Sequence, residues 1–163
     1  MRNEHEITFT TEVQWTEGRS GELRSNGLPT LEMAAPPEFH GRENTWTPEH
    51  LYVGSVASCF MLTSLALAEH AKLVLESFSV KAEGKLGNVE GRRQITEIVL
   101  TPTAVVSRIE DVGRAETLLV KAERSCFIAA SIKSRVVVLP RVYHRRLPAY
   151  PCPVVSPASA PAA

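Results

Sequence analysis

The sequence predicts an α+β fold in which antiparallel strands pack around two long central helices. Several segments alternate apolar and polar residues, which is the pattern of a half-buried strand. Residues 51–68 carry no charge, which indicates a helix that is buried on all sides. Residues 107–124 repeat apolar side chains every three or four positions, which is typical of an amphipathic helix.

Length and charge indicate a single domain. The chain has 163 residues, with 18 Lys and Arg against 18 Asp and Glu. We expect the domain over residues 1–146. Residues 147–163 are rich in proline and alanine, which predicts a disordered tail containing Cys152. The balanced charge argues against a nucleic-acid binder or a protein of anionic membranes, because both need an excess of basic residues.

The cysteine content points to a reducing compartment. Three cysteines without a Cys-x-x-Cys pair argue against a disulfide-built secreted domain and a zinc site. The histidines share no ligand spacing with a thiol or carboxylate, so we expect no metal. The N-terminal residues lack the apolar core of a signal peptide, so we expect a cytoplasmic protein. Residues 51–68 reach the lower limit for a membrane span, but their small polar residues favour a helix enclosed by protein.

The N-terminal third is expected to form short antiparallel strands. Apolar residues alternate with polar ones over residues 6–15: Ile7, Phe9, Val13 and Trp15. Gly18 and the Asn26-Gly27 pair then mark turns.

An aperiodic loop over residues 36–47 leads into the first helix. Thr47 is the expected N-cap, and Pro48 occupies the first helical position, where a missing N–H costs nothing. Glu49 suits the positive end of the helix dipole. We expect this helix to end near Lys72.

The C-terminal half is expected to hold a hairpin, the second helix and a last strand. Residues 78–86 alternate apolar and polar side chains, a turn follows at 87–91, and the return strand covers 92–102. The second helix covers residues 107–124. Residues 132–142 include three consecutive valines and form the last strand.

Two cysteines are the main candidates for chemistry. Cys59 lies inside the uncharged helix, and Cys126 lies just beyond the end of the second helix. Free cysteines often act as small buried hydrophobes, which is the alternative interpretation of both.

Three further features favour a chemical role. Small polar residues surround Cys59, a carboxylate lies upstream on the same helix, and a glycine-flanked turn presents an arginine. These residues are Ser55, Ser58, Thr63, Glu49 and Arg19. Thiol, carboxylate and guanidinium are the groups that a redox-active thiolate requires.

Both cysteine segments resemble motifs of a known family. Residues 46–60, Trp-Thr-Pro-Glu-His-Leu-Tyr-Val-Gly-Ser-Val-Ala-Ser-Cys-Phe, resemble the Asn-Pro-Glu-x-Leu cysteine helix of the OsmC/Ohr proteins, the osmotically inducible and organic hydroperoxide resistance proteins. Residues 122–129 resemble their second cysteine motif, although Phe127 replaces the usual proline. The order of elements also agrees, so the resemblance covers about residues 6–142.

The resemblance implies a thiol peroxidase that reduces organic hydroperoxides, with an OsmC-like fold, an intertwined homodimer and neither metal nor prosthetic cofactor. It assigns Cys59 as the peroxidatic cysteine, Cys126 as the resolving cysteine and Glu49 as the acidic partner. Arg19 resembles the arginine beside the thiolate, with Arg24 and Arg42 as open alternatives.

The resemblance also leaves the reductant and the activity open. A lipoyl protein, thioredoxin or a small thiol would reopen the disulfide. The alternative function is a non-catalytic protein of the same fold that binds an apolar small molecule or senses redox state.

The chemistry of a thiol peroxidase suits these roles. A free thiol titrates at about pH 8.5, whereas attack on a peroxide needs the thiolate. The dipole of its own helix fades before it reaches Cys59, so we expect an arginine from elsewhere to lower the pKa. Attack converts Cys59 to a sulfenic acid, and Cys126 then condenses with it to a disulfide.

Four apolar residues are candidates to line a pocket for an alkyl tail, with core packing as the alternative interpretation. These are Phe39, Trp46, Phe60 and Met61.

Spacing predicts that the working unit is a homodimer. Glu49 and Cys59 are separated by about 15 Å along one helix at 1.5 Å per residue, so they cannot touch. A long arginine or a group from a second subunit must lie between them. An apolar helix also needs more cover than one amphipathic helix and a few strands provide. We therefore expect each active site near a two-fold interface.

Overall fold

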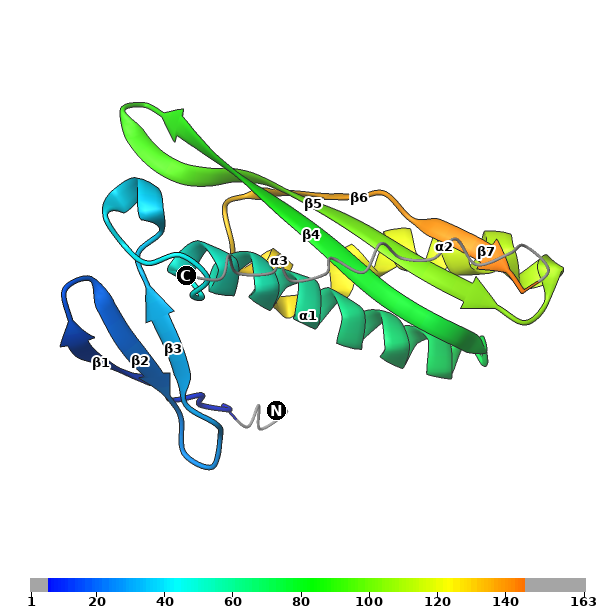
Figure 1. Ribbon diagram of the computed structural model, residues 1–163. Coiled ribbons are helices and arrows are strands. Elements are labelled where there is room, and N and C mark those ends of the chain that lie inside the picture. Colours follow the sequence, from blue (N-terminus) through cyan, green and yellow to red (C-terminus); the bar gives the residue numbers. More distant parts are fainter. Residues whose placement is uncertain (1–5, 146–163) are drawn as a thin grey trace, which may run out of the picture.

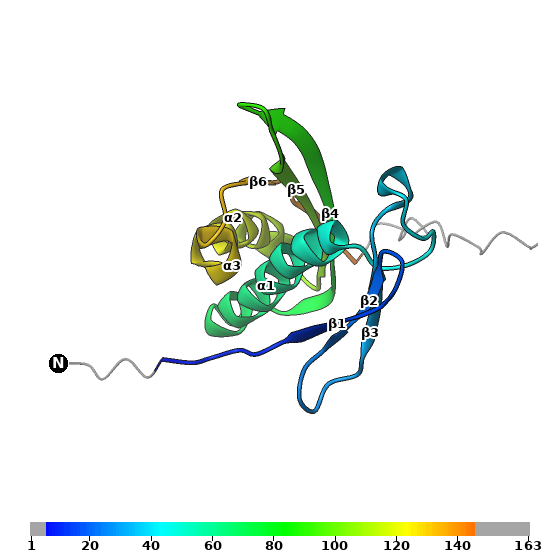
Figure 2. The ribbon, with the colours of Figure 1, turned by 90° about the vertical axis from the view of Figure 1, so that its left-hand side faces the viewer.

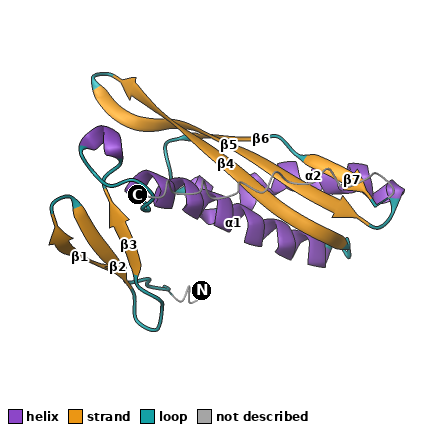
Figure 3. Cartoon of the chain, in the orientation of Figure 1, coloured by secondary structure: helices purple, strands orange, loops and turns teal. Residues whose placement is uncertain are grey.

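The computed structural model describes residues 6–145, so the predicted tail at 147–163 and Cys152 lie outside the described residues. The chain forms a small N-terminal sheet and a larger sheet that carries the helices (Figure 1). Figure 3 shows the N-terminal strands apart from the longer strands, near the start of the first long helix. This arrangement is the α+β class that the sequence predicts.

The N-terminal sheet is an antiparallel meander. It contains β1 (Glu12–Glu17), β2 (Ser20–Arg24) and β3 (Leu31–Ala34) in that order. Gly18 turns the chain between β1 and β2 with a φ of 50°, a conformation that glycine adopts without a steric penalty. The first strand begins at Glu12 and is therefore shorter than the alternation over residues 6–15 predicts.

The first long helix, α1 (Pro48–His70), begins where the sequence predicts. Its N-cap is Thr47, whose hydroxyl accepts a hydrogen bond of 3.3 Å from the His50 N–H. A 3-10 turn, η1 (Pro37–Phe39), lies in the loop before it. The helix ends two residues before Lys72, which adopts a φ of 53° and turns the chain toward the next strand.

The larger sheet is built on a long hairpin. β4 (Leu75–Val89) pairs antiparallel with β5 (Arg92–Val106). The expected last strand is divided into β6 (Arg135–Val138) and β7 (Arg141–His144), and both pair parallel to β5, so the sheet is mixed rather than purely antiparallel. The strand is interrupted at Pro140, which has no N–H to donate to the sheet.

The second helix is shorter than predicted. α2 (Val112–Ala122) is preceded by the 3-10 turn η2 (Ile109–Asp111) and followed by η3 (Glu123–Ser125). A 3-10 turn also repeats every three residues, so the apolar spacing over 107–124 did not separate the three elements. A short helix that the sequence did not predict, α3 (Phe127–Ala130), follows Cys126.

The hydrophobic core lies between the helices and one face of the hairpin. In Figure 2, α1, α2 and α3 lie together on the same side of β4 and β5. Alternate residues of β5 face these helices, and Phe60 of α1 and Leu119 of α2 are completely buried against them. This packing holds the middle of α1, which carries Cys59, against the segment after α2 that carries Cys126.

One face of α1 is exposed, so a single chain does not bury this helix on all sides. The exposed residues recur at helical spacing: Gly54, Ser58, Leu62 and Leu65. Among the described residues, α1 is the one helix whose length and apolar composition would allow it to cross a membrane. Core helices of soluble proteins often have the same length and composition. In β1, Trp15 is also largely exposed.

Candidate active site

The structure brings Cys59 and Cys126 together. Cys59 lies halfway along α1 and is partly exposed, whereas Cys126 precedes α3 and is 1% exposed. Cys59 packs against the core cluster that contains Cys126, and both are free thiols. Cys126 also caps α3, because its sulfur accepts a hydrogen bond of 3.5 Å from the Ala129 N–H.

Hydrogen bonds favour the ionised form of Cys59. Burial acts to raise the pKa of this thiol, but four hydrogen bonds outweigh it, so the pKa lies below its ordinary value. The four partners are the Cys126 side chain, the Ile128 N–H, the Thr63 hydroxyl and the Phe127 N–H. All four are uncharged, so the lowering of the Cys59 pKa in this chain does not come from an arginine.

The pKa of the second thiol, Cys126, is displaced in the opposite direction. Burial, together with the hydrogen bond to Cys59, raises the pKa of Cys126 to about 11. The Ala129 N–H offsets only part of this effect. The first proton that the pair loses as the pH rises therefore comes from Cys59, while Cys126 stays protonated.

Glu49 lies in the first turn of α1, away from Cys59. Its Oε2 atom is buried and accepts no hydrogen bond from any described residue. A buried carboxylate oxygen without a donor is energetically costly. The helix rise places Glu49 about 15 Å along the axis from Cys59, as the spacing predicts.

Arg19 does not contact Cys59 within the chain. Its Nη1 donates a hydrogen bond of 2.5 Å to the Phe39 carbonyl oxygen. Both ribbon views place the β1–β2 turn beyond the N-terminal end of α1, whereas Cys59 lies at the middle of the helix (Figures 1 and 2). The catalytic role of Arg19 therefore stays a prediction.

The two alternative arginines lie in the N-terminal sheet and in the loop that follows it. Arg24 forms an ion pair with Glu22. Arg42 lines a polar cavity of about 320 Å³ together with three glutamates, Glu17, Glu22 and Glu32. No ion pair or hydrogen bond among residues 6–145 joins either arginine to the thiols.

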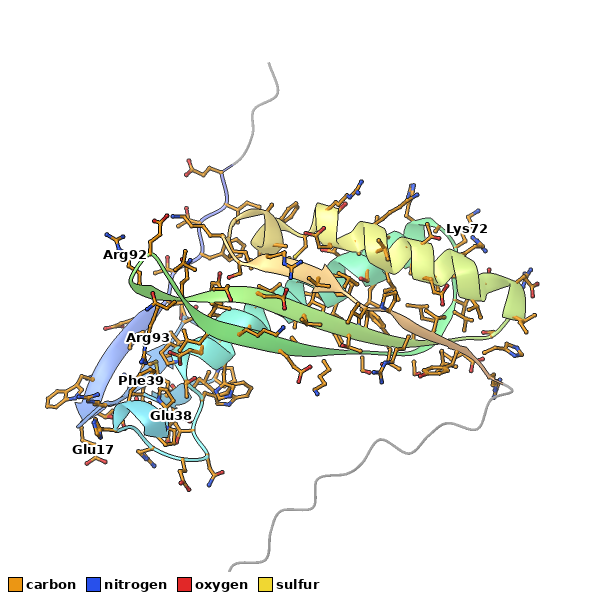
Figure 4. All side chains as sticks on the ribbon, turned by 90° about the horizontal axis from the view of Figure 1, so that it is seen from above. Glu17, Glu38, Phe39, Lys72, Arg92 and Arg93 are labelled. Carbon is orange, nitrogen blue, oxygen red and sulfur yellow. The ribbon has the colours of Figure 1, made fainter. Side chains whose placement is uncertain are left out.

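The four apolar candidates are dispersed. Phe60 is buried in the core, and Met61 is partly buried on α1. Phe39 lies under the Arg93 guanidinium, 5.4 Å from it (Figure 4). Trp46 is 52% exposed and packs edge-on against His50. A single chain does not gather them into one pocket, and their role in substrate binding stays a prediction.

An apolar groove of about 610 Å³ lies between the C-terminal part of α1 and α2 and reaches Ser125, the residue before Cys126. It is lined by apolar residues with three basic groups: Leu67, Ala71, Leu73, Leu118, His70, Arg114 and Lys121. Across the part of the chain that the structure describes, no group of three His, Cys, Asp or Glu side chains is placed to hold a metal ion.

The hydrogen-bond donors around Cys59 were missed by sequence reasoning. Thr63 was noted only as a small polar neighbour, although its position four residues after Cys59 on a helix is a readable signal. The N–H groups of Phe127 and Ile128 have no sequence signal, because their use depends on how α3 packs against α1.

Comparisons with known proteins agree with the fold. A family model described as OsmC-like protein matches residues 41–139. An uncharacterized protein of Bacillus subtilis, YmaD, is 28% identical over 133 residues, which is 78% of this chain and 88% of the relative.

Solved structures share the fold. An OsmC-like protein of unknown function from Vibrio cholerae superposes with a TM-score of 0.77 at 25% identity, covering 83% of this chain and 99% of that one. An organic hydroperoxide resistance protein from Legionella pneumophila superposes with a TM-score of 0.62 at 26% identity, covering 85% and 98%.

Proposed function

The chain belongs to the OsmC-like family, and from that premise we propose that it is a thiol-dependent peroxidase that reduces organic hydroperoxides to alcohols in defence against oxidative stress. The observation that carries the proposal is the packing of Cys59 against the cluster that contains Cys126, with the pKa values of the two thiols displaced in opposite directions. Such an enzyme needs one thiolate to attack and one thiol to resolve. The name of the Legionella pneumophila neighbour supports the substrate class.

The first step consumes the hydroperoxide. The Cys59 thiolate attacks the terminal oxygen of ROOH, an S–O bond forms, and the O–O bond breaks. Cys59 becomes a sulfenic acid, and the departing alkoxide takes a proton to become the alcohol. The sulfur is oxidised by two electrons and the hydroperoxide is reduced by two.

The second step forms the disulfide. The Cys126 sulfur attacks the sulfenic sulfur, an S–S bond forms, and the hydroxide leaves as water with the Cys126 proton. The raised pKa of Cys126 keeps that proton on the thiol until the sulfenic acid appears. A dithiol or two small thiols then reduce the disulfide, and a lipoyl protein, thioredoxin or a small thiol fits this requirement.

We infer that the working unit is a homodimer and that it acts in the cytoplasm. The exposed face of α1, defined by Gly54, Ser58, Leu62 and Leu65, lies beside Cys59 on the same helix. A second copy would cover this face and the exposed apolar side chains of its N-terminal strand. The same copy would bring its Arg19 toward the active site. There the guanidinium would donate a hydrogen bond to Oε2 of Glu49, which has no donor among the described residues of its own chain.

Steady-state turnover tests the proposal. Purified protein is mixed with cumene hydroperoxide and dihydrolipoamide, and hydroperoxide loss is followed. We expect turnover by the native protein and none by Cys59→Ser. In a parallel reaction without dihydrolipoamide, Cys126→Ser should consume about one equivalent and then hold a sulfenic acid. Turnover by Cys59→Ser, or none by the native protein, would reject the assignment.

The alternative function has one observation in its favour. The apolar groove between α1 and α2 has the size of a small-molecule site, and its lining does not include Cys59. A binding protein of this kind would take up an apolar ligand with Cys59 replaced by serine and would leave hydroperoxide unchanged. The turnover experiment therefore separates the two functions.

A further inference from the structure

A chain of two hydrogen bonds joins α1 to the larger sheet. The hydroxyl oxygens of Tyr52 and Ser134 lie 2.9 Å apart, and the Ser134 hydroxyl donates to the Ile95 carbonyl oxygen over 2.5 Å. A serine hydroxyl has one proton. Because Ser134 gives this proton to Ile95, Tyr52 is the donor in the bond between the two hydroxyls. Ser134 is 8% exposed, so water does not readily replace a bond that is lost.

Ser134 marks the end of the segment that carries the second thiol. This segment, residues 126–134, begins at Cys126, passes through α3 and ends directly before β6. In Figure 1, the chain leaves α3 beside the N-terminal half of α1 and rises from there to β6. The Ala130 N–H donates to the Cys126 carbonyl oxygen over 3.0 Å, which closes the single turn of α3. An isolated turn of helix is not stable by itself, so the position of Cys126 depends on what fixes the two ends of the segment.

One face of α1 meets both ends of this segment. Tyr52 lies seven positions before Cys59, which is two helical turns, or about 10 Å along the axis at 1.5 Å per residue. The two side chains therefore project from the same face. Both pack against the core cluster that contains Cys126. Cys59 thus lies near the start of the segment, while Tyr52 is bonded to Ser134 at its end.

We propose that Tyr52 is a positioning residue for disulfide formation: its bond to Ser134 holds residues 126–134 so that Cys126 stays within reach of the oxidised Cys59. The inference rests on the proposed function for its catalytic meaning. In this step the Cys126 sulfur forms an S–S bond with the sulfenic sulfur of Cys59, and the S–O bond breaks as hydroxide leaves with the Cys126 proton as water. A reaction between two groups held in place is fast because their orientation is already fixed.

The same bond should have no part in the first step. Among the described residues, the hydroxyl groups of Tyr52 and Ser134 bond to each other and to the backbone rather than to a thiol. Their loss should therefore leave attack by Cys59 on the hydroperoxide unchanged and slow only the closure of the disulfide. A sulfenic acid that waits longer for Cys126 meets a second hydroperoxide, which transfers one oxygen atom to it and becomes an alcohol. Cys59 then ends as a sulfinic acid.

The test uses Tyr52→Phe, which removes the hydroxyl and keeps the ring. Cys152→Ser is the common background, so that its thiol takes no part. Reduced protein is mixed with about one equivalent of cumene hydroperoxide, and loss of hydroperoxide reports the first step. Alkylation at timed intervals, followed by mass spectrometry, reports the remaining Cys126 thiol. We expect hydroperoxide loss at the background rate and closure slowed about fivefold, the effect of about one neutral hydrogen bond.

Ser134→Ala tests the other end of the bond. It should slow closure at least as much as Tyr52→Phe, because it also removes the bond to Ile95. Addition of Tyr52→Phe to Ser134→Ala should then slow closure no further, since the connection is already broken. If Tyr52→Phe does not fold, as judged by circular dichroism, Ser134→Ala takes its place.

Ser64→Ala is the matched control. Ser64 is buried on the same helix, and its hydroxyl donates to the Phe60 carbonyl oxygen over 2.8 Å rather than to residues 126–134. The variant loses one buried hydrogen bond, as Tyr52→Phe does, and should close its disulfide at the rate of the background protein. Under excess hydroperoxide, intact mass should show more sulfinic acid in Tyr52→Phe than in Ser64→Ala.

Closure at the background rate in Tyr52→Phe would overturn the inference, as would equal slowing of its two steps or an equal delay in Ser64→Ala. Failure of the proposed function gives a different result, in which the native protein consumes no hydroperoxide. Diamide then serves as the oxidant, because it takes two electrons and two protons from Cys59 and Cys126 and becomes a hydrazine. Tyr52→Phe should slow closure by diamide in the same way.

Discussion

Replacement of Phe127 by proline removes one hydrogen-bond donor from Cys59 and leaves the surroundings almost intact. Proline has no N–H, so the backbone donor at residue 127, which acts to lower the Cys59 pKa, is lost. Phe127 is the first residue of α3, a position that suits proline, and its side chain is 83% exposed. Cys126 has φ −79° and ψ 112°, which is the extended conformation required before a proline.

The size of the effect follows from the bond that is lost. A hydrogen bond to a charged group contributes about 1.5–3 kcal/mol, and one pKa unit corresponds to about 1.4 kcal/mol. This gives about one to two units. Cys59 is partly exposed and keeps three other partners, so we expect the lower end, about one unit upward.

The assay is a thiolate titration with Phe127→Ala as the control. Alanine removes the same exposed ring but keeps the N–H, so Phe127→Ala should titrate like the native protein. Alkylation of Cys59 by iodoacetamide at neutral pH should slow about tenfold in Phe127→Pro, since only the thiolate reacts. Equal pKa values in Phe127→Pro and Phe127→Ala would refute the reasoning.

Three further predictions follow from the same geometry. Arg19→Ala should slow the reaction with hydroperoxide and raise the Cys59 pKa in the dimer. Arg24→Ala, which removes an arginine that is paired with Glu22, is the control for loss of charge. An effect of Arg42→Ala alone would assign the role to the loop instead. Leu62→Glu should give a monomer of 17.9 kDa in light scattering, because a charge would be buried in the dimer interface, whereas Glu at the equally exposed Ile109 should leave the dimer intact. Burial and the bond to Cys59 raise the pKa of Cys126 from 9.0 to about 11, so its contribution to the free energy of unfolding is full below about pH 9 and is lost as the pH rises toward 11. Urea denaturation across this range should show a steeper alkaline loss of stability in the native protein than in Cys126→Ser.

Elements with a strong local signal were predicted well. Thr47 and Pro48 fix the start of α1 through the cap and the missing N–H, both of which act within one turn. The hairpin of β4 and β5 follows from the alternation over residues 78–86 and the turn after it. Such signals survive folding because the forces that produce them are local.

Features that depend on distant segments were predicted less well. The exposed face of α1 could not be read from its uncharged sequence, because which side is covered depends on where the sheet and α2 pack. The break in the last strand was also missed. Pro140 is a local signal for such a break, but the valine-rich pattern around it indicated one continuous strand.

The candidate site was likewise predicted only in part. The two cysteines were identified from their motifs, and the structure places them in contact. The uncharged donors that lower the Cys59 pKa were not anticipated, since two of them are backbone groups from a segment nearly 70 residues away in the sequence. Side-chain patterns carry no information about which N–H a fold will point at a sulfur.

Mapping the disulfide formed by one equivalent of hydroperoxide tests the central claim most directly. Reduced protein is treated with cumene hydroperoxide, the remaining thiols are alkylated, and the peptides are identified by mass spectrometry. The account predicts one equivalent of alcohol and a bond between Cys59 and Cys126 of the same chain, with Cys152 alkylated. Free thiols on Cys59 and Cys126 after the hydroperoxide is consumed, or a disulfide that includes Cys152, would contradict it.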